Sequence, residues 1–163
     1  ITTLQDLENS AEVWCVMLEL AQEIGRKLKI YKKKAIGVAI YIRDNTLFTK
    51  QWQCQIPMPS QSASFIAKEA FALFERSYKW NNPIRSVTVT AIDLCPQDAP
   101  YQYDLFIDSK KEEKLSRIDS AVFQIRERYG KDIIRNGTLY RDIKMQTDRA
   151  ELKMPSGMLT MGG

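Results

Sequence analysis

Apolar residues recur along the N-terminal part of the chain with two different periods. From about Ser10 to Lys29 they fall on one face of an amphipathic helix, at Trp14, Met17, Leu18, Ala21, Gly25 and Leu28. Further along, branched residues alternate with small residues and a tyrosine from Ile36 to Ile42. This second pattern predicts a strand with one covered face.

A hairpin, a second helix and a further strand are expected next. The turn residues Asp44-Asn45-Thr46 lead into a second strand over about 47–56, which Pro57 and Pro59 are expected to end. Ser60 or Ser62 then caps a helix that runs to about Trp80. After the breaker at 81–83, apolar and hydroxyl residues alternate over 86–91 as another strand.

These elements predict a fold class. With residues 1–4 as the remnant of a first strand, the order is β-α-β-β-α-β. We expect a two-layer α+β domain over 1–94, in which an antiparallel sheet carries two helices on one face. The other face of the sheet is then left uncovered.

The uncovered face is predicted to be polar and is a candidate binding surface. Hydroxyl, amide and cationic groups donate hydrogen bonds to phosphates without reading bases, whereas a merely solvated face would show the same pattern. The candidate residues come from three strands and from the lysine turn before the hairpin: Tyr41, Arg43, Thr49, Gln51, Gln53, Gln55, Ser86, Thr88, Thr90, Lys32, Lys33 and Lys34.

Charge and composition narrow the functional classes. The formal net charge is +4, and a basic run over 26–34 contains no acidic residue, which suits a polyanion as well as a solvated turn. No apolar run is long enough for a membrane span, so we expect a cytoplasmic protein. The chain has three scattered cysteines and no histidine. We therefore expect no zinc site and no Ser or Cys nucleophile with an imidazole base. The sequence also contains no Gly-rich phosphate-binding loop.

A short motif lies in the linker predicted over 95–108. The sequence Q-Y-D-L-F places two bulky apolar side chains where the local sequence offers nothing to bury them. Either they fold back onto the domain or they bind a partner. Beyond them, a capping box at Ser109 and Glu112 predicts a helix that Gly130 stops, and residues 154–163 are expected to be disordered.

The order of these segments resembles a known family. The helix ending in E-I-G-R-K-L, the strand pair, the helix A-K-E-A-F-A-L-F and the strand I-R-S-V-T-V-T-A-I-D-L are similar to the C-terminal little finger domain of bacterial Y-family translesion DNA polymerases, of the DNA polymerase IV and ImpB/MucB/SamB type. The first strand of that family looks mostly absent here. The resemblance implies a module that lies across the DNA major groove and grips the backbone. It also implies that Q-Y-D-L-F binds the sliding clamp, through Gln102, Asp104, Leu105 and Phe106.

By this interpretation the chain, which begins at Ile1, is a fragment without the polymerase palm and its Mg²⁺-binding carboxylates. Its expected partners are DNA, the sliding clamp and the catalytic core of the same polypeptide, with no cofactor of its own and no enzymatic activity alone. The extension over 109–163 packs on the domain, on a second copy or on a dedicated partner. A stand-alone protein-interaction adaptor is the main alternative, and a small enzyme is the third.

Overall fold

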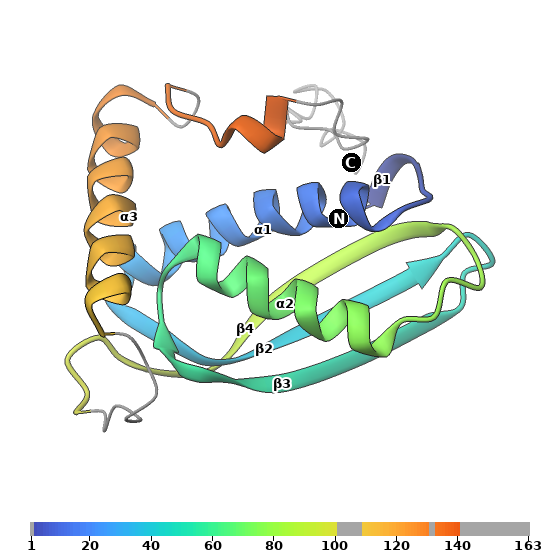
Figure 1. Cartoon of the computed structure of the whole chain (residues 1–163), viewed down its shortest axis with the longest axis horizontal. Helices are drawn as coiled ribbons and strands as arrows, with labels where there is room; N and C mark the ends of the chain where they lie inside the picture. The colour runs from blue at the N-terminus through green and yellow to red at the C-terminus, as the bar shows by residue number, and fades with distance from the viewer. Residues whose placement is uncertain (1, 101–108, 131–132, 141–163) are drawn as a thin grey trace, which may run out of the picture.

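The structure, a computed structural model, describes residues 2–100, 109–130 and 133–140. Its strands form one antiparallel sheet in the order β1-β4-β2-β3, and α1 and α2 cover one face of it (Figure 1). This confirms the predicted α+β fold and its β-α-β-β-α-β order. The elements are β1 (Thr2–Leu7), α1 (Ser10–Ile30), β2 (Lys33–Asp44), β3 (Thr49–Ser60), α2 (Ala63–Ser77), β4 (Ile84–Pro96), α3 (Ser109–Tyr129) and the 3-10 helix η1 (Gly137–Tyr140).

The core lies between the helix pair and the covered face of the sheet. Val38, Ile40 and Ile42 of β2 are buried, as the alternating pattern predicts, and they pack in one cluster with residues of both helices. Phe74 of α2 is among the largest fully buried side chains and stacks on Phe71, with 6.0 Å between ring centroids. Burying a side chain of this size contributes about 1.5–3 kcal/mol to the stability of the domain.

Side chains cap the two helices that cover the sheet. The Asn9 side chain accepts a hydrogen bond from the Glu12 backbone N–H at 2.9 Å and begins α1. Ser62, one of the two residues predicted for this role, accepts from the N–H of Phe65 at 3.4 Å and begins α2. α2 ends at Ser77, earlier than the predicted Trp80, because the backbone of the next residue is extended.

All four strands of the described sheet extend beyond their predicted bounds. β1 extends to Leu7 and pairs with β4, so the first strand that looked mostly absent in the sequence is present. β3 continues past Pro57 and Pro59 to Ser60, so the prediction that these prolines end it was wrong. The ladder with β2 is interrupted there, since its paired positions jump from Gln55 to Ser60. The prolines lie within this irregular stretch of an edge strand, where a missing N–H is tolerated.

Gly25 is placed where α1 meets the start of α2. A Cβ atom at Gly25 would lie 3.0 Å from the Ala63 Cβ and 3.1 Å from the Gln61 carbonyl oxygen. Gly25→Ala should therefore lower the free energy of unfolding by about 1 kcal/mol, because overpacking at about 1–3 kcal/mol outweighs the helix propensity that alanine gains. Urea unfolding measures this, with Gly137→Ala as the control in open space. A stabilised Gly25→Ala variant would contradict the close approach.

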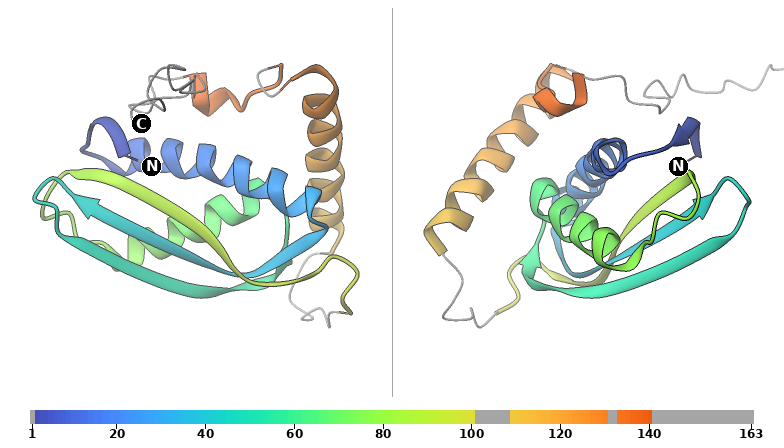
Figure 2. Two further views of the ribbon diagram at one scale, coloured as in Figure 1. Left: turned by 180° about the vertical axis from the view of Figure 1, so that it is seen from behind. Right: turned by 45° about the vertical axis from the view of Figure 1, so that its right-hand side comes forward.

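The C-terminal extension folds back over the helix layer. α3 stands across the end of α1, and η1 lies alongside α1 (Figures 1 and 2). The Lys29 ammonium donates to the Asp119 carbonyl oxygen at 2.5 Å and lies 5.5 Å from the ring centroid of Phe123. Burial at this junction lowers the pKa of Lys29. Leu139 of η1 joins the core cluster, so the extension contacts the domain through the middle of α3 and through η1.

Some apolar side chains of α3 are exposed. Ile118 is 49% exposed and Tyr129 is 63% exposed. The helix ends before Gly130, which has a φ of +99° and serves as the predicted stop. None of the helices in the described ranges is long and apolar enough to span a membrane.

Candidate nucleic-acid interface

The sheet face opposite the helices carries all nine predicted strand residues in register. Residues that pair directly across antiparallel strands lie on the same face. Arg43 of β2 pairs with Thr49 of β3 and Ser86 of β4, and Tyr41 pairs with Gln51 and Thr88. The next rows are Gln53-Ala39-Thr90 and Gln55-Gly37-Ile92. We call these four rows the open face.

The side chains of the open face differ in exposure from strand to strand. All four β3 residues of the face are exposed, as is Thr90 of β4. Ala39 is buried, so the middle of its row offers little more than backbone. In the next row a Cβ at Gly37 would lie 2.9 Å from Cγ1 of Ile92, so the Ile92 side chain covers that position. Tyr41 is 37% exposed, whereas Ser86 is 7% exposed and presents little surface to a ligand. None of the twelve positions in these rows is a carboxylate.

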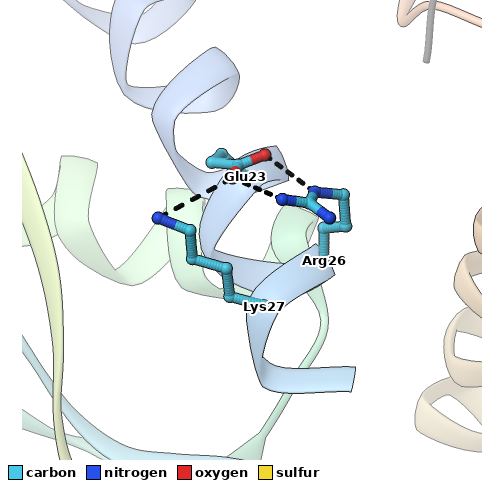
Figure 3. Close-up of polar contacts among 3 residues, drawn as sticks. All are labelled: Glu23, Arg26 and Lys27. Atoms are coloured by element: carbon cyan, nitrogen blue, oxygen red, sulfur yellow. Dashed lines mark hydrogen bonds and ion pairs between the residues drawn. The ribbon is translucent and has the colours of Figure 1, made fainter. Parts of the chain in front are cut away.

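The basic run near the end of α1 divides into three parts. Arg26 and Lys27 form ion pairs with Glu23 on the same helix, at 2.8 Å and 3.7 Å (Figure 3). Lys29 makes the contact with α3 described above. The run itself holds no acidic residue, and Glu23 offsets one of the two positive charges of its first part. The lysine turn carries three further charges.

The lysine turn, Lys32 to Lys34, lies at one end of β2. Lys32 has a φ of +50°, and its carbonyl oxygen accepts from the Gln97 N–H at 2.9 Å. Lys33 pairs with Pro96, four residues before the Gly37 row. None of the three lysines forms a salt bridge with another residue of the described ranges. The structure therefore places these lysines beyond the Gly37 end of the open face, at about 13 Å along β2.

Asp44 organises the turn at the opposite end of the face. Its Oδ1 accepts hydrogen bonds from the Thr46 hydroxyl at 2.7 Å, the Thr46 N–H at 2.9 Å and the Phe48 N–H at 3.0 Å. Its Oδ2 accepts from the Asn82 side chain at 3.1 Å. These donors, the Thr46 hydroxyl first, hold the pKa of Asp44 below its ordinary value.

The turn should therefore resist acid. A carboxylate with a lowered folded pKa stabilises the native state above its unfolded pKa of about 3.9, and this contribution is lost as the pH falls through the lower folded value. We expect the amide signals of Thr46 and Phe48 in NMR spectra to stay constant until the pH is below the ordinary Asp range. Thr46→Val, which removes the main donor, should move this transition to higher pH. A wild-type transition at the ordinary Asp pKa would contradict the hydrogen-bond network.

Some of the predicted features lie outside the residues that the structure describes. The motif residues Gln102, Asp104, Leu105 and Phe106 lie outside them, as does the predicted disordered tail. Cys15, Cys54 and Cys95 are free thiols. Within the described ranges, His, Cys, Asp and Glu side chains nowhere gather in a group that could hold a metal ion.

The chain is similar in sequence to a known protein family and to several known proteins. Residues 1–105 match the impB/mucB/samB family C-terminal domain. The chain is 32% identical to a DNA polymerase IV of Acetivibrio thermocellus over 87% of its own length and 36% of that protein. It is 28% identical to UvrX of Bacillus subtilis strain 168, a protein named for UV-damage repair, over 91% of this chain and 36% of that protein. The chain is also 23% identical to a DNA polymerase IV of Clostridium kluyveri, over 88% of this chain and 37% of that protein.

The chain thus spans little more than a third of the length of the relatives it matches. The family match covers the whole sheet and both covering helices, which are the elements on which the sequence resemblance was based. The resemblance is confirmed: this chain belongs to the impB/mucB/samB family and carries its C-terminal domain.

Proposed function

We propose that this chain is the DNA-binding C-terminal part of a translesion DNA polymerase, and that its open face binds the sugar-phosphate backbone of duplex DNA. The observation that carries this proposal is the open face itself, with polar side chains of three strands in register and no carboxylate among them. The names of the relatives, DNA polymerase IV above all, support the same function.

The dimensions and chemistry of the open face suit a DNA duplex. Four rows along β2 span about 20 Å, and the outer strands lie about 10 Å apart, close to the major-groove width of about 12 Å. Glutamine and threonine donate hydrogen bonds to phosphates, and backbone contacts of this kind position a protein without specifying sequence. The small, buried side chain of Ala39 leaves room for a strand of DNA between Gln53 and Thr90 of the same row.

The rest of the proposal concerns the whole protein. Polymerase activity, with its Mg²⁺ ions, belongs to a catalytic core elsewhere in the same polypeptide. The whole protein is cytoplasmic in this proposal. The linker motif binds the sliding clamp through Gln102, Asp104, Leu105 and Phe106. The linker leaves β4 at Pro96, which pairs with Lys33. The lysine turn therefore lies beside the point at which the chain leaves β4.

Titration of the isolated chain with duplexes of unrelated sequence tests the DNA part of the proposal. We expect weak binding at low salt that hardly depends on sequence, because few groups on the open face read bases. The adaptor alternative predicts no DNA binding at low salt. That result, or a strong preference for one duplex, would contradict the proposal.

A further inference from the structure

A pocket of about 470 Å³ opens on the helix side of the sheet, where the β2–β3 hairpin meets the end of α2. Ile42, Lys50 and Trp52 line it. They alternate along their strands with Arg43, Thr49 and Gln51, which belong to the open face. The pocket and the open face therefore lie on opposite sides of the same hairpin end.

Aromatic rings form much of the pocket wall. Phe48, Trp52 and Tyr78 all line it, and Phe48 is 60% exposed. Trp52 and Tyr78 pack edge to face with 6.4 Å between ring centroids. The Tyr78 hydroxyl donates to the Asn82 carbonyl oxygen at 2.8 Å, which holds the ring in place. A flat aromatic ligand thus meets rings that are already positioned.

The charged lining of the pocket favours an anion. Lys50 and Lys79 are exposed, and the Lys50 ammonium lies 5.5 Å from the centroid of the Phe48 ring. The carboxylate in the lining is that of Asp44, whose two oxygens already accept the hydrogen bonds of the turn. The pocket lining thus carries two ammonium groups and one carboxylate, and that carboxylate already accepts hydrogen bonds from the protein.

We propose that this pocket binds one nucleotide of single-stranded DNA, with its base against the aromatic wall and its phosphate at Lys50 and Lys79. Aromatic side chains beside cations bind single strands with little sequence preference, and the volume lies in the range of small-ligand pockets. The inference rests on the proposed function. A strand that follows the open face past the row of Arg43 and Thr49 reaches the hairpin tip, and the pocket lies on the other side of that tip.

The triple variant Phe48→Ala/Lys50→Ala/Lys79→Ala tests the inference, because all three side chains are exposed and their removal leaves the core intact. Fluorescence anisotropy with a labelled oligo(dT) and with a blunt duplex of the same length gives both affinities. We expect the variant to lose about tenfold or more in oligo(dT) affinity, since one stacked base contributes about 1–3 kcal/mol. Its duplex affinity should stay within about twofold of wild type, because the open face is unchanged.

A matched control carries Leu47→Ala with Lys68→Ala and Lys114→Ala, which removes one exposed apolar side chain of the same turn and two exposed lysines outside the pocket. It should bind oligo(dT) like wild type. Equal losses in control and test variants, or wild-type oligo(dT) affinity in the test variant, would overturn the pocket inference while duplex binding stands. A wild-type chain that binds neither DNA would instead overturn the proposed function, and the inference with it.

Discussion

Raising the salt concentration from about 50 to about 200 mM should weaken duplex binding by this chain about 150-fold. Lys32, Lys33, Lys34 and Arg43 are the cations at the open face and its end. With these as the phosphate contacts, log K falls against log salt with a slope of about −3.6. Replacing the three lysines by alanine leaves Arg43 alone, so the slope should flatten to about −0.9 and the salt effect to about 3.5-fold. Titrations at stepwise salt concentrations measure both slopes.

The control for this prediction removes the same charge elsewhere. Lys27→Ala/Lys68→Ala/Lys114→Ala takes three exposed lysines from α1, α2 and α3. Its slope should remain close to that of wild type, because these side chains do not lie on the open face or in the lysine turn. A wild-type affinity that is indifferent to salt, or equal flattening by both triple variants, would show that the lysine turn makes no specific phosphate contact.

Leu105→Ala/Phe106→Ala should remove most of the affinity of the chain for a bacterial sliding clamp. A short linker peptide loses conformational entropy on binding, so the wild-type chain should bind with a Kd of about 1 μM, or about −8 kcal/mol. Binding energy concentrates in a few buried bulky side chains, and each anchor of this kind contributes about 2 kcal/mol or more. We therefore expect a loss of about a hundredfold or more, measured by calorimetry with purified clamp.

Tyr103→Ala provides the matched control, since it truncates a bulky side chain of the same motif that is not among the proposed clamp contacts. It should bind the clamp nearly as well as wild type. The double variant should also keep its duplex affinity, because neither residue is among the proposed DNA contacts. If the double variant binds the clamp as wild type does, Q-Y-D-L-F is an ordinary linker, and the proposal is reduced to DNA binding alone.

Local sequence patterns were sufficient to predict the open face. Side chains alternate strictly along a strand, so the hairpin from β2 to β3 and the alternation in β4 already assign each residue to a face. Ile40 and Ile42 had to be buried, and Tyr41 and Arg43 then had to point the other way. The registers in the structure agree with this at every predicted position.

Features set by tertiary contacts were not predictable in the same way. Asp6 is a poor strand former, but the pairing of Leu7 with Ile84 of β4 extends β1 past it. The helical pattern continues past Ser77, yet α2 ends there, with Tyr78 hydrogen-bonded to Asn82. The nucleotide pocket combines the hairpin with the end of α2, segments that are distant in sequence, and no local motif indicates it.

The two prolines of β3 also bear on self-association. In the described sheet β3 is an edge strand, and its outer side is not hydrogen-bonded to another strand. Long edge strands can pair with a second molecule and seed aggregation, and natural proteins often interrupt them with proline. Pro57 and Pro59 supply no N–H within the last few residues of β3. A second chain therefore finds no continuous ladder of donors to extend over these residues.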